Sequence, residues 1–245
     1  MGDQGTGSLA EMSKTERLLD APPGPQLPNF DGAPAQEILK WALTEYFPDV
    51  VLASSMQDAV LIDLAWKIEP RIKVFFLETG FHFYETLATA NRIRERYNLD
   101  LVMLEPIDNP RIWSEEGYTA CCEDRKVIPM NNFLRGKRAW ITGLRRSDSP
   151  TRANAKAAEW DPVRELVKVN PIVDWTDQQV DGYIEEHDLI VNPLRLEGYD
   201  SIGCVPCTVP GSGREGRWAG NLKVECGIHQ PLPLKVITTP PRPGA

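Results

Sequence analysis

The stretch Asp49-Val-Val-Leu-Ala-Ser-Ser-Met-Gln-Asp58 decides the fold class of this chain. Its first half is a short apolar run, which is typical of a strand buried on both faces of a parallel sheet. Small polar residues interrupt the run, and the apolar segment Ala59–Trp66 that follows is predicted to be a helix. A strand that passes through a Ser-rich turn into a helix indicates an alternating α/β fold.

The same alternation continues along the chain. Apolar runs predict further strands at Lys73–Leu77, Leu101–Leu104 and Ala139–Thr142. A charged amphipathic helix is expected at Tyr84–Tyr97, and Thr176-Asp-Gln-Gln179 has the form of a capping box that starts another helix. Strands alternating with helices indicate an α/β protein with a mostly parallel, twisted sheet flanked by helices.

Small polar turns follow three of the predicted strands. Ligands of open α/β sheets bind beyond the carboxyl ends of the strands, so these turns are candidate ligand contacts. Ser54 and Ser55 lead into a helix, whose N-terminal N–H groups and dipole favour an anion such as phosphate or sulfate. Serine at this place is also an ordinary helix N-cap, and the motif alone does not separate the two interpretations. The other turns are Glu78-Thr79-Gly80 and Thr142–Arg146.

Composition narrows the class of protein. The 245 residues carry a formal net charge of −8, which disfavours general binding to nucleic acid. An apolar fraction of 42% suffices for a full core. No stretch approaches the ~18 consecutive apolar residues of a membrane span, and no secretory signal is visible. We therefore expect a cytoplasmic protein that binds neither nucleic acid nor membrane.

The five cysteines form two pairs and one single residue. Cys121 and Cys122 are adjacent, Cys204 and Cys207 form a Cys-x-x-Cys pair, and Cys226 stands alone. Without a visible signal peptide, a reducing compartment and a metal or redox role fit better than a disulfide framework.

The four paired cysteines have three interpretations: inert core thiols, a zinc site, or ligands of an iron–sulfur cluster. Their clustering argues against inert thiols. Zinc prefers two Cys-x-x-Cys knuckles, and the adjacent pair Cys121-Cys122 lacks that loop. Adjacent cysteines can instead bind two different irons of a [4Fe–4S] cube, so the cluster is favoured over zinc.

The single cysteine lies in a polar segment with Lys223 and His229 on either side of it. The thiolate is the nucleophilic form of cysteine, and nearby positive charge favours it. Gly227 gives the backbone freedom, which suits a thiol that must first attack and then be presented to a reductant. The alternative is an incidental buried cysteine. We regard Cys226 as a candidate nucleophile.

Basic residues gather near the cysteines and the turns, although the chain is acidic. This distribution indicates binding of a small anion, with solvated surface cations as the alternative. The residues concerned are Arg125, Lys126, Arg145, Arg146, Arg152, Arg214, Arg217 and Lys223.

Two cysteine segments resemble those of the assimilatory adenylyl-sulfate (APS) reductases. Cys121-Cys122-Glu-Asp-Arg125-Lys126-Val-Ile-Pro129 is similar to their Cys-Cys-x-x-Arg-Lys-x-x-Pro segment. Gly198-Tyr-Asp-Ser-Ile-Gly203-Cys204-Val-Pro-Cys207-Thr208 is similar to their second ligand segment.

Three further segments resemble the same family. Arg214-Glu-Gly-Arg217-Trp218 is similar to its arginine pair, and Lys223-Val-Glu-Cys226-Gly-Ile-His229 to its catalytic segment. Trp140-Ile-Thr-Gly143-Leu-Arg145-Arg146, with Arg152 beyond, is similar to its arginine loop. The likeness runs from about residue 50 to residue 229.

The resemblance implies an adenine nucleotide α-hydrolase-like fold, of the PP-loop ATP pyrophosphatase type. The implied reaction is the reduction of APS to sulfite and AMP in assimilatory sulfate reduction and cysteine biosynthesis. Cys226 would attack the sulfur of the sulfate group, leaving an enzyme S-sulfocysteine and AMP. Thioredoxin or a glutaredoxin would then release sulfite. A homodimer or homotetramer is implied as well.

The resemblance also implies roles for individual residues. Cys226, Lys126 and His229 would be catalytic, with Lys126 between the cluster and the sulfate. Asp58 would cap or orient the first helix. The [4Fe–4S] cluster would be held by Cys121, Cys122, Cys204 and Cys207, with a positioning and electrostatic role. The substrate-binding residues would be Ser54, Ser55, Glu78, Thr79, Gly80, Arg145, Arg146, Arg152, Arg214 and Arg217.

The chain divides into four expected segments. Residues 1–34, rich in Pro, Gly and Asp toward their end, are predicted to be a flexible arm. Residues 35–210 would form the α/β nucleotide- and cluster-binding domain, and residues 211–235 the catalytic segment. Residues 236–245 are predicted to be a disordered tail.

Three other functions compete. A reductase of 3′-phosphoadenylyl sulfate (PAPS) would share the Glu-Cys-Gly segment but commonly lacks the four cluster cysteines. A tRNA sulfur-transfer enzyme would need a Ser-Gly-Gly-x-Asp-Ser loop and a basic face, which this chain lacks. A non-catalytic iron–sulfur or zinc redox sensor would need neither Cys226 nor the paired arginines.

Overall fold

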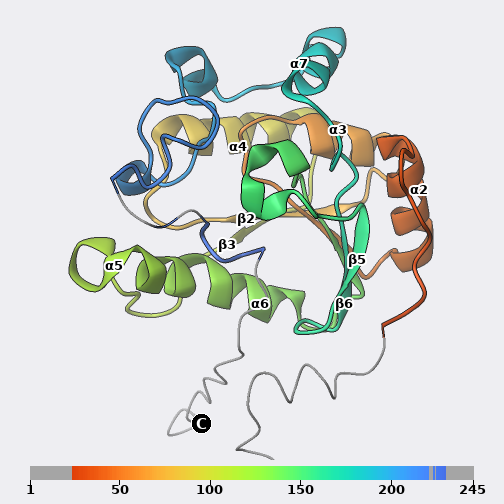
Figure 1. Cartoon of the computed structure of the whole chain (residues 1–245), viewed down its shortest axis with the longest axis horizontal. Helices are drawn as coiled ribbons and strands as arrows, with labels where there is room; N and C mark the ends of the chain where they lie inside the picture. The colour runs from red at the N-terminus through yellow and green to blue at the C-terminus, as the bar shows by residue number, and fades with distance from the viewer. Residues whose placement is uncertain (1–23, 221–222, 224, 230–245) are drawn as a thin grey trace, which may run out of the picture.

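The computed structural model describes residues 24–220, 223 and 225–229. Its six-stranded sheet has the order β3-β2-β1-β4-β6-β5, and β5 at one edge is antiparallel to β6 whereas the other neighbours are parallel (Figure 1). This is the mostly parallel sheet that the sequence predicts. The strands are β1 (Val50–Ala53), β2 (Lys73–Leu77), β3 (Leu101–Leu104), β4 (Ala139–Ile141), β5 (Ala158–Asp161) and β6 (Leu166–Val169).

The strand order reverses between β1 and β4. From β1 the chain proceeds outward through β2 to β3, and it then returns to place β4 on the other side of β1. In the resulting register, Val51 of β1 lies opposite Lys73 of β2 and Trp140 of β4. Open α/β sheets bind their ligands at such a switch point, beyond the carboxyl ends of the strands. We therefore expect the ligand site at the turns that follow β1 and β4.

Helices cover both faces of the sheet (Figure 1). One apolar core packs Leu39, Ile62 and Ile93 against one face, and a second packs Met130 and Leu134 against the other. The first face is covered by α2 (Ala35–Tyr46), α3 (Val60–Trp66) and α4 (Tyr84–Tyr97), and the second by α5 (Trp113–Cys122) and α6 (Ile128–Leu134). The helix α7 (Asp177–Glu186) packs on α3, where Tyr183 donates to Asp63 at 2.7 Å.

All four strands and all three helices that the sequence predicts are present. The predicted strand at Ala139–Thr142 ends one residue earlier, at Ile141, and the capping box before α7 is formed, with the Thr176 N–H donating to Gln179 Oε1 at 2.8 Å. The elements that were not predicted are α2, α5, α6, β5 and β6.

The helical region that carries the adjacent cysteines is irregular. α5 is interrupted at Gly117, whose φ is +83°. The π-helix Glu123–Val127 follows, and there the N–H of Ile128 donates to the carbonyl oxygen of Glu123. A π-helical turn places an extra residue in a helix and is frequent at functional sites. This turn contains Lys126 and joins α5 to α6.

The rest of the described chain is largely irregular. Leu27 and Phe30, from the segment that we assigned to the N-terminal arm, pack against the larger core. Residues 1–23 of that arm and the predicted tail at 236–245 lie outside the described residues. Among the described helices, none combines the length and apolar character that crossing a bilayer requires. Short helical turns occupy 146–148, 150–152, 193–197 and 205–207.

Candidate active site

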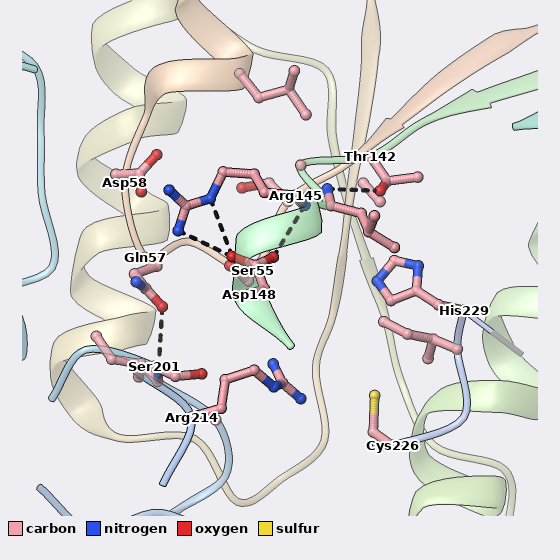
Figure 2. A pocket seen from close by; sticks show the side chains of 18 of the residues that line it. Ser55, Gln57, Asp58, Thr142, Arg145, Asp148, Ser201, Arg214, Cys226 and His229 are labelled. Carbon is pink, nitrogen blue, oxygen red and sulfur yellow. Dashed lines mark hydrogen bonds and ion pairs between the residues drawn. The ribbon is translucent and has the colours of Figure 1, made fainter. Parts of the chain in front are cut away.

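A cavity of about 550 Å³ lies beyond the carboxyl ends of β1, β2 and β4 (Figure 2). Its lining includes Ser54 and Ser55 after β1, and Leu144 and Arg145 after β4. The C-terminal segment closes one side, and Figure 2 shows the sulfur of Cys226 directed toward the region between Arg214 and His229. The cavity therefore lies at the switch point of the sheet, with the candidate nucleophile at its wall.

The turn after β1 places Ser54 and Ser55 at the cavity. Ser54 Oγ accepts a hydrogen bond from the N–H of Met56 at 3.1 Å, and Met56 is held at a φ of +58°. Neither serine is the N-cap of α3, which is Ala59. Asp58 Oδ1 accepts a hydrogen bond from the N–H of Val60 at 3.1 Å, so its expected role in orienting the first helix is confirmed.

Gln57 connects this turn to the cysteine-containing loop far along the chain. Its Nε2 donates to the carbonyl oxygen of Asp200 at 2.9 Å, and its Oε1 accepts from the N–H of Ile202 at 3.1 Å. Gln57 could not be predicted as a site residue, because its partners are more than 140 residues away. The two bonds fix the loop before Cys204 against the rim of the cavity.

The turn after β2 lies at the cysteines rather than at the cavity. Thr79 Oγ1 is 3.2 Å from Cys204 Sγ, and the carbonyl oxygen of Thr79 accepts from Arg125 at 2.8 Å. The Glu78 carboxylate accepts from the N–H of Gly80 at 2.6 Å within the turn itself. The structure therefore does not bring Glu78, Thr79 and Gly80 into the cavity lining, where the sequence placed them.

Arg145 and Arg146, adjacent in sequence, have different surroundings. Arg145 lines the cavity and forms ion pairs with Asp148 at 3.0 Å and Asp177 at 2.8 Å. Arg146 is absent from the cavity lining, because it pairs with Asp174 and donates from Nε to the carbonyl oxygen of Ala155. Both arginines were predicted to contact the substrate, and of this adjacent pair only Arg145 lines the cavity.

Arg152 and Arg214 line the cavity and share one carboxylate. Arg152 donates from Nε and Nη2 to Glu225, both at 2.9 Å, and Arg214 Nη2 donates to Glu225 at 3.2 Å. Arg152 also pairs with Asp148 at 2.9 Å. The carboxylates of Glu225 and Asp148, which no sequence motif indicated, offset much of the positive charge of these arginines.

Lys126 and Arg217 are the remaining cations near Cys226. In the described part of the chain, neither forms an ion pair with a carboxylate. Arg217 Nη1 contacts the carbonyl oxygen of Ile202 at 3.3 Å, and its guanidinium lies 4.6 Å from the ring of Trp218. These two side chains offer the cavity positive charge that no described carboxylate neutralises.

Lys126 borders two spaces at once. It lines the 550 Å³ cavity and also the small gap between the paired cysteines. Burial lowers its pKa, but negative charge at the cysteines, with Cys204 as the largest contribution, outweighs this and raises the pKa above its usual value. Lys126 is thus a cation placed between the cysteine pairs and Cys226.

His229 lines the cavity as a neutral imidazole. Burial, followed by the charges of Arg152 and Lys168, lowers its pKa well below the usual value. Its ring stacks on Trp140 with centroids 5.7 Å apart. The positive charge that we expected His229 to supply beside Cys226 is therefore absent at neutral pH, and His229 can act there only as a hydrogen-bonding group.

The four paired cysteines converge although about 80 residues separate the pairs. Cys121, Cys122, Cys204 and Cys207 are all buried and line one gap of about 10 Å³ together with Lys126. Burial raises the pKa of Cys122 to about 11. A hydrogen bond from Cys207, together with Lys126 and Thr79, lowers that of Cys204 well below its usual value.

Four buried thiols that converge from two segments supply the donor set of a Cys₄ metal site. Among the residues described, no three His, Cys, Asp or Glu side chains are arranged to hold one metal ion. Four thiols from two segments, with Lys126 and Arg125 beside them, match the ligand number of a Cys₄ cluster and the need to stabilise thiolates. The cysteine side chains would have to move apart to admit a cube, because the gap between them is small.

The fold and the cavity define an α/β protein with a nucleotide-sized site and a cysteine at its wall. The phosphoadenosine phosphosulfate reductase domain model matches residues 49–210, and the chain belongs to this family. This agrees with the family resemblance of the cysteine and arginine segments.

Relatives of similar sequence support the same family. The chain is 44% identical over 209 residues to an adenosine 5′-phosphosulfate reductase of Mycolicibacterium smegmatis, covering 80% of this chain and 89% of that protein. It is 43% identical over 230 residues to the enzyme of that name from Mycobacterium tuberculosis, covering 82% and 90%.

Two solved structures share the fold. A phosphoadenylyl-sulfate reductase from Candida auris has a TM-score of 0.63 at 24% identity, covering 83% of this chain and 100% of that one. An FMN adenylyltransferase from Candida glabrata has a TM-score of 0.56 at 14% identity, covering 81% and 72%. The prediction of an adenine nucleotide α-hydrolase-like fold is confirmed.

Proposed function

We propose that this protein is an adenylyl-sulfate reductase, which reduces APS to sulfite and AMP with electrons from a protein dithiol. The observation that carries the proposal is that Cys226 meets Lys126 and Arg217 at the wall of a nucleotide-sized cavity. The relatives named adenosine 5′-phosphosulfate reductase, at 43–44% identity over about 80% of the chain, support the same assignment. The need for reduced thiols and a small dithiol protein is consistent with a cytoplasmic setting.

In the first step the Cys226 thiolate forms a bond to the sulfur of the sulfate group. The bond from that sulfur to the bridging oxygen breaks, and its electron pair leaves with the phosphate of AMP. The product on the enzyme is S-sulfocysteine. Lys126 and Arg217 would meet the negative charge of the sulfate and phosphate oxygens, which otherwise repels a thiolate.

In the second step a thiolate of thioredoxin or a glutaredoxin attacks the sulfur atom of Cys226. Sulfite leaves with the electron pair of the sulfur–sulfur bond, and the second thiol of the reductant resolves the mixed disulfide. The dithiol is oxidised to a disulfide, and the sulfate sulfur is reduced by two electrons.

Four cysteines would hold a [4Fe–4S] cluster in this proposal: Cys121, Cys122, Cys204 and Cys207. When bound, the cluster would supply a fixed charge next to Lys126 and would not change its own oxidation state. Lys126 would interact with both the cluster and the substrate, because it borders both the paired cysteines and the cavity. The buried thiols of Cys121 and Cys122, whose pKa values are raised, would release their protons to solvent when the metal binds, as metal ligands do.

The charge of the cavity favours APS over PAPS. Six Lys and Arg side chains line it against five Asp side chains, so the excess of positive charge is small. PAPS carries an additional phosphate, which would require further neutralisation. Figure 2 also places Asp58 on the side of the cavity away from Cys226, where the nucleoside would lie if the sulfate meets the thiol.

The test is the initial rate of thioredoxin-dependent sulfite release from anaerobically purified protein, with APS and PAPS in parallel. We expect a strong preference for APS. A preference for PAPS would keep the fold and the Cys226 chemistry but overturn the substrate assignment. If neither substrate yields sulfite, the sensor and sulfur-transfer functions take precedence.

Arg217→Ala is expected to raise the dissociation constant of AMP about 10- to 100-fold, because a hydrogen-bonded charge without a carboxylate partner is lost from the cavity. Isothermal titration calorimetry with AMP would measure the change. Arg92→Ala, at an exposed position on α4, is the matched control and should bind AMP as the unmodified protein does. An unaltered constant in Arg217→Ala would count against the anion site.

A further inference from the structure

Glu225, the residue before Cys226, is held by Arg152 from a loop 73 residues away and by Arg214, which lies 11 residues before it. Its carboxylate accepts from Arg152 Nε and Nη2 at 2.9 Å each and from Arg214 Nη2 at 3.2 Å. The hydroxyls of Thr151 and Ser149 lie at 3.3 and 3.4 Å. Only 6% of the Glu225 side chain is exposed, against 10% for Arg152. A two-pronged arginine contact of this kind fixes orientation as well as position.

The charge state of Glu225 suits this contact. Burial raises its pKa, but the hydrogen bonds and charge of Arg152 outweigh this and lower the pKa below its usual value. The carboxylate is therefore ionised at neutral pH. Its partner Arg152 is engaged on both sides, because Nη1 donates to Asp148 at 2.9 Å.

A second contact holds the chain on the other side of Cys226. Arg164 Nη2 donates to the carbonyl oxygen of Ile228 at 3.2 Å, and the ring of His229 stacks on Trp140. Gly227 lies between, at a φ of +95° that other residues rarely adopt. The segment that carries Cys226 is therefore held on both sides, at Glu225 before it and at Ile228 and His229 after it.

We propose that Glu225 is the positioning residue for Cys226: its carboxylate, docked on Arg152 and Arg214, holds the thiol at the cavity. The proposal rests on the proposed function for the chemical step. A thiol must approach the sulfur in line with the leaving oxygen, and a freely moving segment would spend little time in that geometry. Arg152 and Arg214 then serve mainly to hold the carboxylate, and Lys126 and Arg217 meet the substrate's charge.

The experiment compares Glu225→Gln and Glu225→Asp with Glu215→Gln, an exposed glutamate in the same C-terminal segment that serves as the control. Three quantities are measured on the cluster-loaded protein: single-turnover formation of S-sulfocysteine from APS, the dissociation constant of AMP, and the rate at which iodoacetamide alkylates Cys226, located by mass spectrometry.

For Glu225→Gln we expect S-sulfocysteine formation to slow about 10-fold or more, because the thiol is less well placed. Alkylation of Cys226 should accelerate several-fold, because the segment is released. AMP should bind several-fold tighter, because two arginines that line the cavity lose their carboxylate. Glu225→Asp keeps the charge on a shorter side chain and should fall between. A merely structural role would weaken AMP binding.

Wild-type values of S-sulfocysteine formation and alkylation in Glu225→Gln would overturn the proposal, as would weaker AMP binding in both variants. Loss of folding in both variants, seen by circular dichroism, would assign Glu225 a structural role and also overturn it. If the unmodified protein forms no S-sulfocysteine from APS, the proposed function fails. The alkylation rates then still decide whether Glu225 holds Cys226.

Discussion

Cys226→Ser is expected to abolish sulfite formation from APS, with a loss on the order of 10³-fold or more. A serine hydroxyl of similar size stays protonated where a thiol ionises, so the attack on sulfur has no nucleophile. The cavity and the paired cysteines should otherwise be unchanged, because Cys226 is not among the residues that line the small gap between the paired cysteines. Coupled assays of sulfite release and of S-sulfocysteine by mass spectrometry would measure the effect.

The controls for this variant separate an enzyme from a sensor. Iron content, the visible absorbance of the cluster and the dissociation constant of AMP should match those of the unmodified protein. Sulfite release at the wild-type rate would refute the mechanism. Loss of the cluster together with activity would instead show that Cys226 belongs to the metal site.

Lys126→Ala is expected to slow single-turnover formation of S-sulfocysteine about 10²- to 10³-fold, the loss typical of one preorganised donor to a developing charge. Lys126 borders both the cavity and the cysteines, and negative charge at the cysteines raises its pKa, so it is charged at every pH used for the assay. The rate would be measured by rapid quench, with the cluster content determined for the same sample.

Lys40→Ala is the matched control, since Lys40 is an exposed lysine on α2. It should keep the wild-type rate. Lys126 would be removed from the mechanism by an unchanged rate in Lys126→Ala. A variant that lost its cluster would report on cluster stability, and its rate would then be compared with that of cluster-free protein of the natural sequence.

Each strand that the sequence revealed contains an unbroken run of at least three apolar residues. β1 and β2 are buried on both faces, so their runs are continuous and easy to recognise. β6 was missed because Lys168 interrupts its apolar run. In the structure the ammonium of Lys168 is 3.0 Å from Glu159, its opposite neighbour on β5, so the charge is neutralised within the sheet. No pattern in the sequence of either strand indicates such a cross-strand pair.

The candidate site shows a similar division. Three residues that the sequence predicts for the site, Cys226, Lys126 and Arg217, line one cavity in the structure. It could not separate Arg145 from Arg146. Arg145 has an extended backbone, with φ −120° and ψ 149°, and successive side chains of an extended chain point to opposite sides. That geometry explains why only one of the two arginines reaches the cavity.

The carboxylates that pair with the arginines could not be predicted from the sequence. Glu225 meets Arg152 across 73 residues, and nothing in the sequence around either residue indicates the other. Asp148 is closer, but its carboxylate divides between Arg145 and Arg152, which depends on how the loop after β4 folds. Charge pairing of this kind is a property of the tertiary structure.

The π-helical turn at Glu123–Val127 makes the number of residues as important as their identity. Removal of one residue there would restore an ordinary helix without changing the identity of any other side chain. It would also turn everything beyond it by about 100° relative to Cys121 and Cys122. Met130 would rotate out of the core under the sheet, or the cysteines would rotate away from their partners. Between the paired cysteines and α6, a change of length is therefore harder to accommodate than a change of side chain.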